Sequence, residues 1–127
     1  MRTIVHTPNA PAPIGPYSQA VLVDHTLYVS GQIAIDPSTG NLVEGSIEAE
    51  TEQVMKNIGA VLNAVELNYS HIVKTSIFLS NMDDFPKVNA VYGAYFKDHF
   101  PARETVQVSR LPKNVNVEIS VIAYKPK

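Results

Sequence analysis

The sequence of 127 residues contains no cysteine. Disulfide bonds, thiolate catalysis and zinc sites built on thiolates are therefore excluded. Charged residues are also scarce, at 17% of the chain against a typical ~25%. The net charge is −2, and a slightly negative chain is a poor match for nucleic acid, whose phosphates attract basic surfaces.

Long hydrophobic runs are missing as well. No stretch approaches the ~18 uninterrupted apolar residues of a membrane-spanning helix, and the opening from Met1 to His6 holds no apolar segment typical of a secretory signal. We therefore expect a cytoplasmic protein with a single domain, residues 1–127. Hydrophobic residues make up 45% of the chain, so either the core is large or another molecule covers part of the surface.

Common site motifs are absent too. The sequence has no phosphate-binding G-x-x-x-x-G-K-[ST] loop and no G-x-G-x-x-G, H-E-x-x-H or G-x-S-x-G motif. Four scattered histidines lack the spacing of metal ligands: His6, His25, His71 and His99. We expect a protein without metal or cofactor.

Apolar periodicity predicts two helices. The first is capped by Ser46 and carries an apolar stripe at helical spacing that runs from Val54 to Val65. The second begins near Asp83-Asp84 and ends at Pro101. Strands are predicted over 21–23, 27–29, 72–79, 105–108 and 117–124, and a short extra strand over 3–5 is a further option.

The order β-β-α-β-α-β-β indicates an α+β fold, a mixed β-sheet with two helices packed on one face. Apolar residues occupy both faces of the strands, as in Ile77-Phe78-Leu79 and Val121-Ile122-Ala123. Two helices can cover only one of these faces. We therefore infer a homo-oligomer whose subunits pack sheet against sheet. A closed barrel is the alternative, because it also buries both faces.

Several polar side chains are candidates for a site. A tight turn, Gly15-Pro16-Tyr17-Ser18, delivers a tyrosine, and Ser30-Gly31 would let a ligand approach the backbone closely. Arg103, where a helix gives way to a strand, has a planar guanidinium that matches a carboxylate. Glu118 lies inside an apolar strand, and in a pocket its pKa would rise, which suits proton exchange near neutral pH. A structural tyrosine, an ordinary turn and a structural Arg–Glu ion pair remain open readings of the same residues.

In their order along the chain, these segments resemble the Rid/YjgF family of reactive-intermediate imine deaminases. The resemblance covers nearly the whole sequence. Its segments include A-P-I-G-P-Y-S-Q at 12–19, S-G-Q at 30–32, Q-V-M-K-N at 53–57, M-D-D-F at 82–85, F-P-A-R at 100–103, L-P-K at 111–113 and V-E-I at 117–119. Each segment is weak alone, but together, in a chain of the family's length, they are highly specific.

The resemblance implies a chorismate-mutase-like fold and a homotrimer with ligand clefts between neighbouring subunits. It also implies a hydrolase of metabolite damage control, a 2-iminobutanoate/2-iminopropanoate deaminase. Such an enzyme converts 2-imino acids and their enamine tautomers, 2-aminoacrylate and 2-aminocrotonate, to 2-keto acids and ammonia. Pyridoxal-phosphate-dependent dehydratases release these intermediates.

The resemblance also assigns roles by position. Arg103 would hold the substrate carboxylate, Glu118 would orient and activate the attacking water, and Tyr17 would lie near the substrate. The substrate-binding residues would be Ser30, Gly31, Asn89 and Thr105.

Two positions depart from the family pattern. Many members carry a cysteine where this chain has Thr105, which should change the polarity of the pocket rather than abolish the chemistry. Glu104 replaces a small residue directly after Arg103, so its carboxylate could compete for the guanidinium or repel an anionic substrate.

Two other functions stay open. The same cleft could serve a non-catalytic module that binds small carboxylates or 2-keto acids. An endoribonuclease or translation-inhibitor activity, reported for some relatives, fits less well, because the basic residues are scattered and the net charge is negative.

Overall fold

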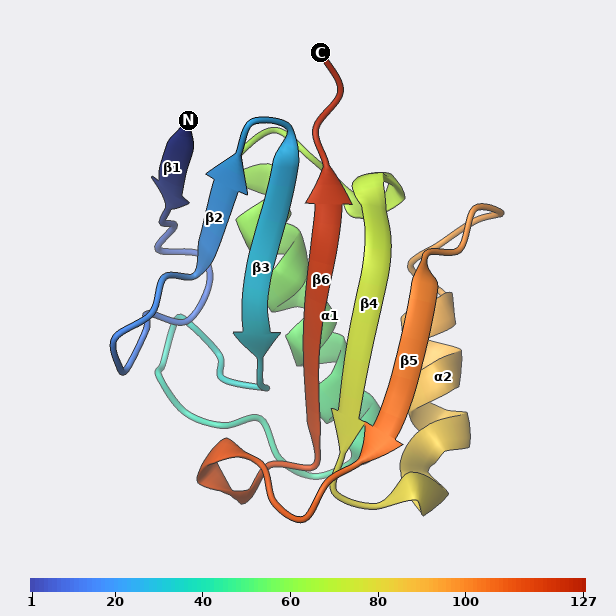
Figure 1. Ribbon diagram of the computed structural model, residues 1–127. Helices are drawn as coiled ribbons and strands as arrows, with labels where there is room; N and C mark the ends of the chain where they lie inside the picture. The colour runs from blue at the N-terminus through green and yellow to red at the C-terminus, as the bar shows by residue number, and fades with distance from the viewer.

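The computed structural model describes all 127 residues. Six strands form one mixed sheet in the spatial order β1-β2-β3-β6-β4-β5 (Figure 1). They are β1 (Arg2–Val5), β2 (Ala20–Val23), β3 (Thr26–Gln32), β4 (Ile72–Leu79), β5 (Ala102–Gln107) and β6 (Val117–Tyr124). Neighbours run antiparallel except β4 and β5, which are parallel. The predicted element order is confirmed, with β1 as the additional strand.

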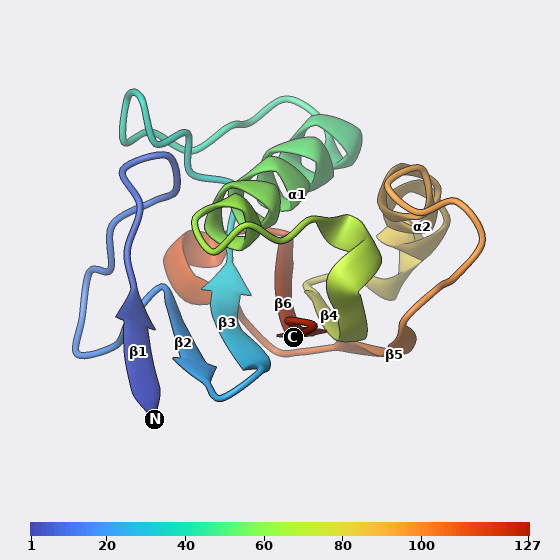
Figure 2. The same ribbon diagram turned by 90° about the horizontal axis from the view of Figure 1, so that it is seen from above.

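Two helices, α1 (Ile47–Asn63) and α2 (Phe85–Gly93), lie on the same side of the sheet (Figure 2). α1 begins at Ser46, whose hydroxyl oxygen accepts a hydrogen bond from the Ala49 N–H at 3.0 Å. Glu48 and Glu50 in its first turn complement the positive end of the helix dipole. The predicted cap at Ser46 is confirmed. Neither helix is long and apolar enough to cross a membrane.

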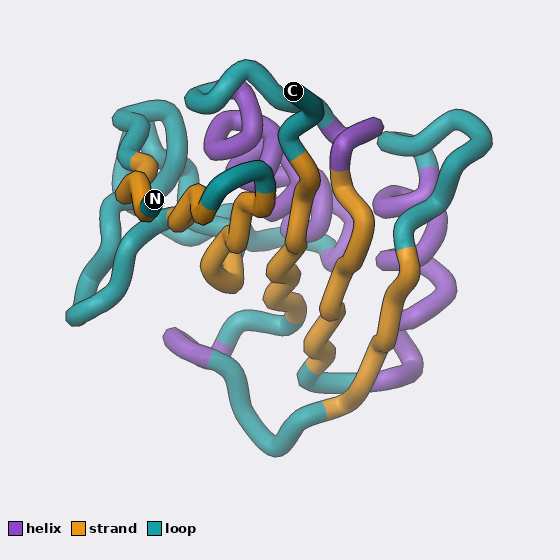
Figure 3. Tube along the Cα trace, turned by 45° about the horizontal axis from the view of Figure 1, so that its top comes forward, coloured by secondary structure: helices purple, strands orange, loops and turns teal.

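Short 3-10 turns connect the larger elements: η1 (Tyr69–His71), η2 (Met82–Asp84) and η3 (Pro112–Asn114). Two long connections lie at the end of the sheet where β3 stops (Figure 3). Residues 6–19 join β1 to β2, and residues 33–46 join β3 to α1. η3 contains two left-handed residues, Lys113 with φ 55° and Asn114 with φ 56°. These connections build most of the cavity described below.

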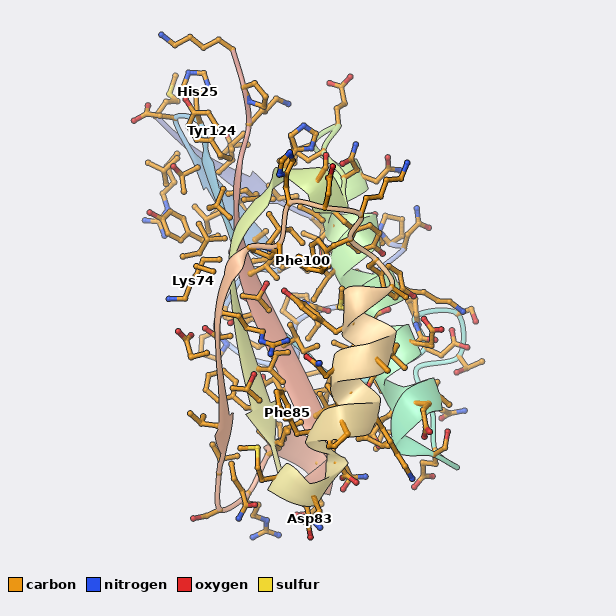
Figure 4. All side chains as sticks on the ribbon, turned by 90° about the vertical axis from the view of Figure 1, so that its right-hand side faces the viewer. His25, Lys74, Asp83, Phe85, Phe100 and Tyr124 are labelled. Atoms are coloured by element: carbon orange, nitrogen blue, oxygen red, sulfur yellow. The ribbon has the colours of Figure 1, made fainter.

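The two faces of the sheet differ as the alternation of β6 predicts. Val117 and Ile119 are fully buried and belong to the core that the sheet forms with the helices. The opposite face has no helix, and Lys74 points away from the helices on that side (Figure 4). Tyr28 is 50% exposed there and Val106 41%. The apolar residues on both faces are thus confirmed, but the sheet is open rather than a closed barrel, with β1 and β5 at its edges.

The second helix is shorter than predicted. α2 ends at Gly93 and not at Pro101, because Tyr95 and Phe96 donate their N–H groups to carbonyls three residues back, a tighter turn than an α-helix. β5 begins at Ala102, earlier than the predicted strand, so Arg103 lies inside a strand rather than ahead of one.

Candidate active site

A cavity of about 360 Å³ lies where β3 and β6 meet the connecting segments. Four of the predicted site residues line it: Tyr17, Ser30, Gly31 and Glu118. Its remaining walls are largely apolar and come from the N-terminal segment, the residues after β3 and the η3 turn. The cavity therefore combines one carboxylate with a mostly hydrophobic lining.

The N-terminal wall is held by one buried amide, the side chain of Gln19, which is 2% exposed. Its oxygen accepts a hydrogen bond from the Thr7 N–H at 2.7 Å, and its nitrogen donates to the carbonyls of Thr7, Ala10 and Pro11 at 3.0, 3.2 and 3.0 Å. Sequence reasoning missed Gln19 as a site residue. Its place directly after Tyr17 and Ser18 is the signal that could have indicated it.

Ser30 connects this wall to β3. Its hydroxyl donates to the Ser18 carbonyl at 2.5 Å, and its N–H donates to the Gln19 carbonyl at 2.9 Å. Since the hydroxyl hydrogen is used, the oxygen can only accept further hydrogen bonds from a ligand.

Glu118 is half-buried on β6 and has no hydrogen-bond or ion-pair partner in the chain. Burial raises the pKa of its carboxyl above the usual range. The carboxylate lies over Gly31, where a Cβ would stand 2.9 Å from the carboxyl carbon. Residue 31 must therefore lack a side chain if Glu118 is to keep this position.

The second cluster surrounds Arg103 on β5. Its Nη1 donates to Asn89 Oδ1 at 2.7 Å, and its guanidinium carbon lies 5.4 Å from the ring centre of Phe85 and 5.3 Å from that of Tyr92. These three partners follow one face of α2 at i, i+4 and i+7. A hollow of about 500 Å³ adjoins the guanidinium and includes the exposed Phe100.

The two clusters lie on opposite faces of the sheet. Arg103 pairs in register with the fully buried Thr75 of β4, on the helix side. Glu118 pairs with Phe78 of the same strand, an odd number of residues away and hence on the other side. The cavities around the two groups share no lining residue. Within one chain, the structure thus divides the predicted site: Tyr17, Ser30 and Gly31 lie with Glu118, whereas Asn89 lies with Arg103.

Thr105 lies on β5 two residues beyond Arg103, on the same face of the strand. Its hydroxyl oxygen is buried and has no hydrogen-bond partner in the chain. It lines neither of the two cavities.

The carboxylate of Glu104 does not compete for the guanidinium of Arg103, contrary to the expectation from the sequence. Alternation along β5 sends it to the helix-free face, where its carboxylate lies 3.0 Å from the Lys74 Nζ and accepts a hydrogen bond from the Ser76 hydroxyl. The hydrogen bonds from Ser76 and Lys74 lower the pKa of the Glu104 carboxyl. The guanidinium of Arg103 is left without any carboxylate partner in the chain.

The histidines contribute to neither cluster: His71 forms a capping box with Asn68, and the His25 Nδ1 lies 3.0 Å from the Lys125 carbonyl. No three metal-ligating side chains of the His, Cys, Asp or Glu type lie close enough to hold an ion.

The family described as Endoribonuclease L-PSP matches residues 7–125 of the chain. A RutC family protein from Pyrococcus horikoshii is 49% identical over 125 residues, covering 98% of this chain and 99% of its own. The human 2-iminobutanoate/2-iminopropanoate deaminase is 48% identical over 125 residues, covering 98% of this chain and 91% of its own. The crystal structure of a Rid family protein from Yersinia pestis is 52% identical with a TM-score of 0.95, covering 98% and 99% of the two chains.

These similarities extend over almost the entire sequence, and the order of strands and helices is that of the solved relatives. The chain therefore belongs to the Rid/YjgF family, whose sequence model carries the name Endoribonuclease L-PSP.

Proposed function

We propose that the protein is a 2-imino acid deaminase whose active site is completed between two copies of the chain. One observation carries the proposal: a guanidinium without a carboxylate partner, Arg103, and a half-buried carboxylate without a hydrogen-bond or ion-pair partner, Glu118, lie on opposite faces of one sheet. Arg103 is complementary to the carboxylate of the substrate, and Glu118 is complementary to the water that attacks it. Relatives named 2-iminobutanoate/2-iminopropanoate deaminase support the same reaction.

Arg103 provides the anchor. Its planar fork can hold the substrate carboxylate through two parallel hydrogen bonds, which fixes the adjacent C2 carbon. Asn89 already occupies one N–H of the fork and keeps its orientation. In the bound substrate, C2 is therefore held in a fixed position for attack by the water.

Glu118 provides the proton transfer. A carboxylate with a raised pKa takes a proton from water as the oxygen bonds to C2 of the imine. Glu118 passes that proton to the imine nitrogen, which gives the neutral carbinolamine. It then takes the proton of the new hydroxyl group and returns it to the nitrogen, so that the C2–N bond breaks, ammonia leaves and the C2–O bond becomes the carbonyl of the 2-keto acid. Ser30, which can only accept, fits the imine N–H, and the apolar walls fit the side chain of a 2-imino acid.

The helix-free sheet face provides the means of assembly. Exposed apolar residues such as Tyr28 and Val106 lie on this face, which is also the face of Glu118. Since the Arg103 and Glu118 clusters are different surfaces, joining one to the other makes a head-to-tail contact, and such contacts form a closed ring when the rotation from one subunit to the next closes. We propose a homotrimer, three chains of 13.9 kDa, with one site at each interface.

Subunit mixing tests the proposal. Arg103→Ala and Glu118→Gln should each be inactive towards 2-iminobutanoate generated by an amino-acid oxidase. After equal amounts are unfolded and refolded together, about one quarter of the interfaces should pair an intact Glu118 with an intact Arg103 and recover activity. A site contained in one chain predicts no recovery. Sedimentation of the parent as a stable monomer would also contradict the proposal.

A further inference from the structure

The guanidinium of Arg103 is enclosed by two aromatic rings of α2, Phe85 and Tyr92, at nearly equal distances of 5.4 and 5.3 Å. We propose that Tyr92 is a positioning residue: with Phe85 it fixes Arg103 before substrate arrives and leaves only an in-plane edge of the fork for a carboxylate. This inference rests on the proposed role of Arg103 as the carboxylate anchor.

Tyr92 is itself locked in place. It is 3% exposed, and its hydroxyl donates to Thr75 Oγ1 at 2.9 Å. Thr75 is fully buried and is the register partner of Arg103 across β4 and β5. The ring over which the guanidinium carbon lies is thus hydrogen-bonded to β4, the strand next to the one that carries Arg103. Phe85 is less buried and lies on the side of α2 that faces the sheet (Figure 4).

The partners of Arg103 within the chain are all uncharged. Structural arginines are commonly held by a carboxylate, which neutralises part of their charge. Here one amide oxygen and two ring faces hold the group, and the nearest carboxylate in sequence, Glu104, lies on the opposite face of the strand. The arrangement restrains the side chain and keeps its full positive charge for a ligand.

The two rings also limit the direction from which a ligand can approach the guanidinium. The aromatic rings flank the guanidinium, and Asn89 takes one N–H of Nη1. A planar carboxylate can still reach the remaining N–H groups in the plane of the fork. Arginine loses rotamer freedom when it is clamped, so a pre-positioned fork binds an anion more tightly than a mobile one.

Three variants test the proposal: Tyr92→Leu, Tyr92→Phe and, as a matched control, Tyr95→Leu. Tyr95 lies just beyond the same helix. Its ring packs at a tilt against Tyr69, with 4.9 Å between ring centres, and its hydroxyl donates a hydrogen bond to Glu52 rather than contacting Arg103. Binding of 2-oxobutanoate by calorimetry and steady-state kinetics with 2-iminobutanoate are measured on each.

We expect Tyr92→Leu to weaken 2-oxobutanoate binding and raise KM about tenfold, with kcat changed less than about twofold. Tyr92→Phe retains the ring and should stay within about threefold of the parent, and Tyr95→Leu should match the parent. Equal binding by Tyr92→Leu and Tyr95→Leu would overturn the proposal, as would a parent that does not bind 2-oxobutanoate. If Tyr92→Leu does not fold, Phe85→Leu decides by the same criterion.

Binding and turnover separate this inference from the proposed function. The parent could bind 2-oxobutanoate but hydrolyse no imine, while Tyr92→Leu loses the binding. That result would support the positioning role of Tyr92 and refute the deaminase function.

Discussion

The carboxylate of Glu118 occupies the space that a side chain at Gly31 would need. A Cβ there would lie 2.9 Å from the carboxyl carbon and 3.1 Å from Cγ, closer than real Cβ atoms normally come. In the pair Ser30-Gly31, the absence of a Cβ at Gly31 is therefore as important as the hydroxyl of Ser30. The position of the carboxylate in the cavity depends on this one glycine.

Gly31→Ala should displace the carboxylate of Glu118 and lower kcat for 2-iminobutanoate at least tenfold. Because Glu118 is a flexible side chain at the edge of a cavity, the change should cost little stability. Activity assays and thermal unfolding measure the two effects separately. A variant with the parent's kcat would show that the observed position of Glu118 is not needed.

Glu118→Gln should retain 2-oxobutanoate binding and lose turnover, since only the proton-accepting group is removed. If turnover survives, Glu118 is not the base. If no imine is hydrolysed by the parent while the anion binds, the protein is a binding module rather than an enzyme.

The pH dependence follows from the raised pKa of Glu118. As a base the carboxyl must be ionised, so kcat/KM should fall as the pH drops through that raised pKa. For stability the sign is reversed: the folded state favours the protonated carboxyl, so folding is penalised as the pH rises above the unfolded value. Glu118→Gln should therefore unfold at a higher temperature than the parent at pH 7 and at about the same temperature at pH 4.

Gln19→Leu should destabilise the N-terminal wall of the cavity. It removes four hydrogen bonds and leaves the Thr7 N–H and the carbonyls of Thr7, Ala10 and Pro11 without this partner, at a cost of roughly 2–4 kcal/mol. Urea unfolding and the rate of proteolysis within residues 7–18 check the effect. Gln107→Leu is the control, since that exposed side chain accepts a single hydrogen bond, from the Met82 N–H, and should cost less than about 1 kcal/mol.

Glu50 ties α1 to the residues that lead into β6. It is 6% exposed, and its two oxygens accept hydrogen bonds from the Asn116 N–H at 2.8 Å and Nδ2 at 2.9 Å. Glu50→Ala should lower the free energy of unfolding by roughly 1.5–3 kcal/mol, whereas Glu48→Ala, at an exposed position of the same helical turn, should lower it by less than about 1 kcal/mol. Equal losses would show that the Asn116 contacts add nothing.

Local patterns predicted much of the fold. The cap at Ser46, the stripe of α1 and the alternation of β6 follow from the residues themselves, and so does the need to cover a second apolar face. The end of α2 did not follow, because Tyr95 and Phe96 are apolar at helical spacing yet bond three residues back.

The candidate site depended on information that no single segment contains. Arg103 and Glu104 can be assigned to opposite faces only once both are known to lie within β5, and the predicted strand began later. The separation of Arg103 from Glu118 depends on the register of both strands against β4. Phe85, Asn89 and Tyr92 have the spacing of one helix face, but only the packing of α2 against β5 shows that this face holds a guanidinium.

β5 is an edge strand, and its sequence A-R-E-T-V-Q carries two charges. An uncovered strand edge is a template for aggregation, and charged side chains oppose such stacking. Arg103 is one of these charges, so we expect it to oppose edge-to-edge pairing in addition to its proposed role as a carboxylate anchor. Arg103→Ala removes both at once, whereas Arg103→Lys keeps a charge on the edge and loses the planar fork, so a comparison of the two variants separates a damaged site from an aggregating protein.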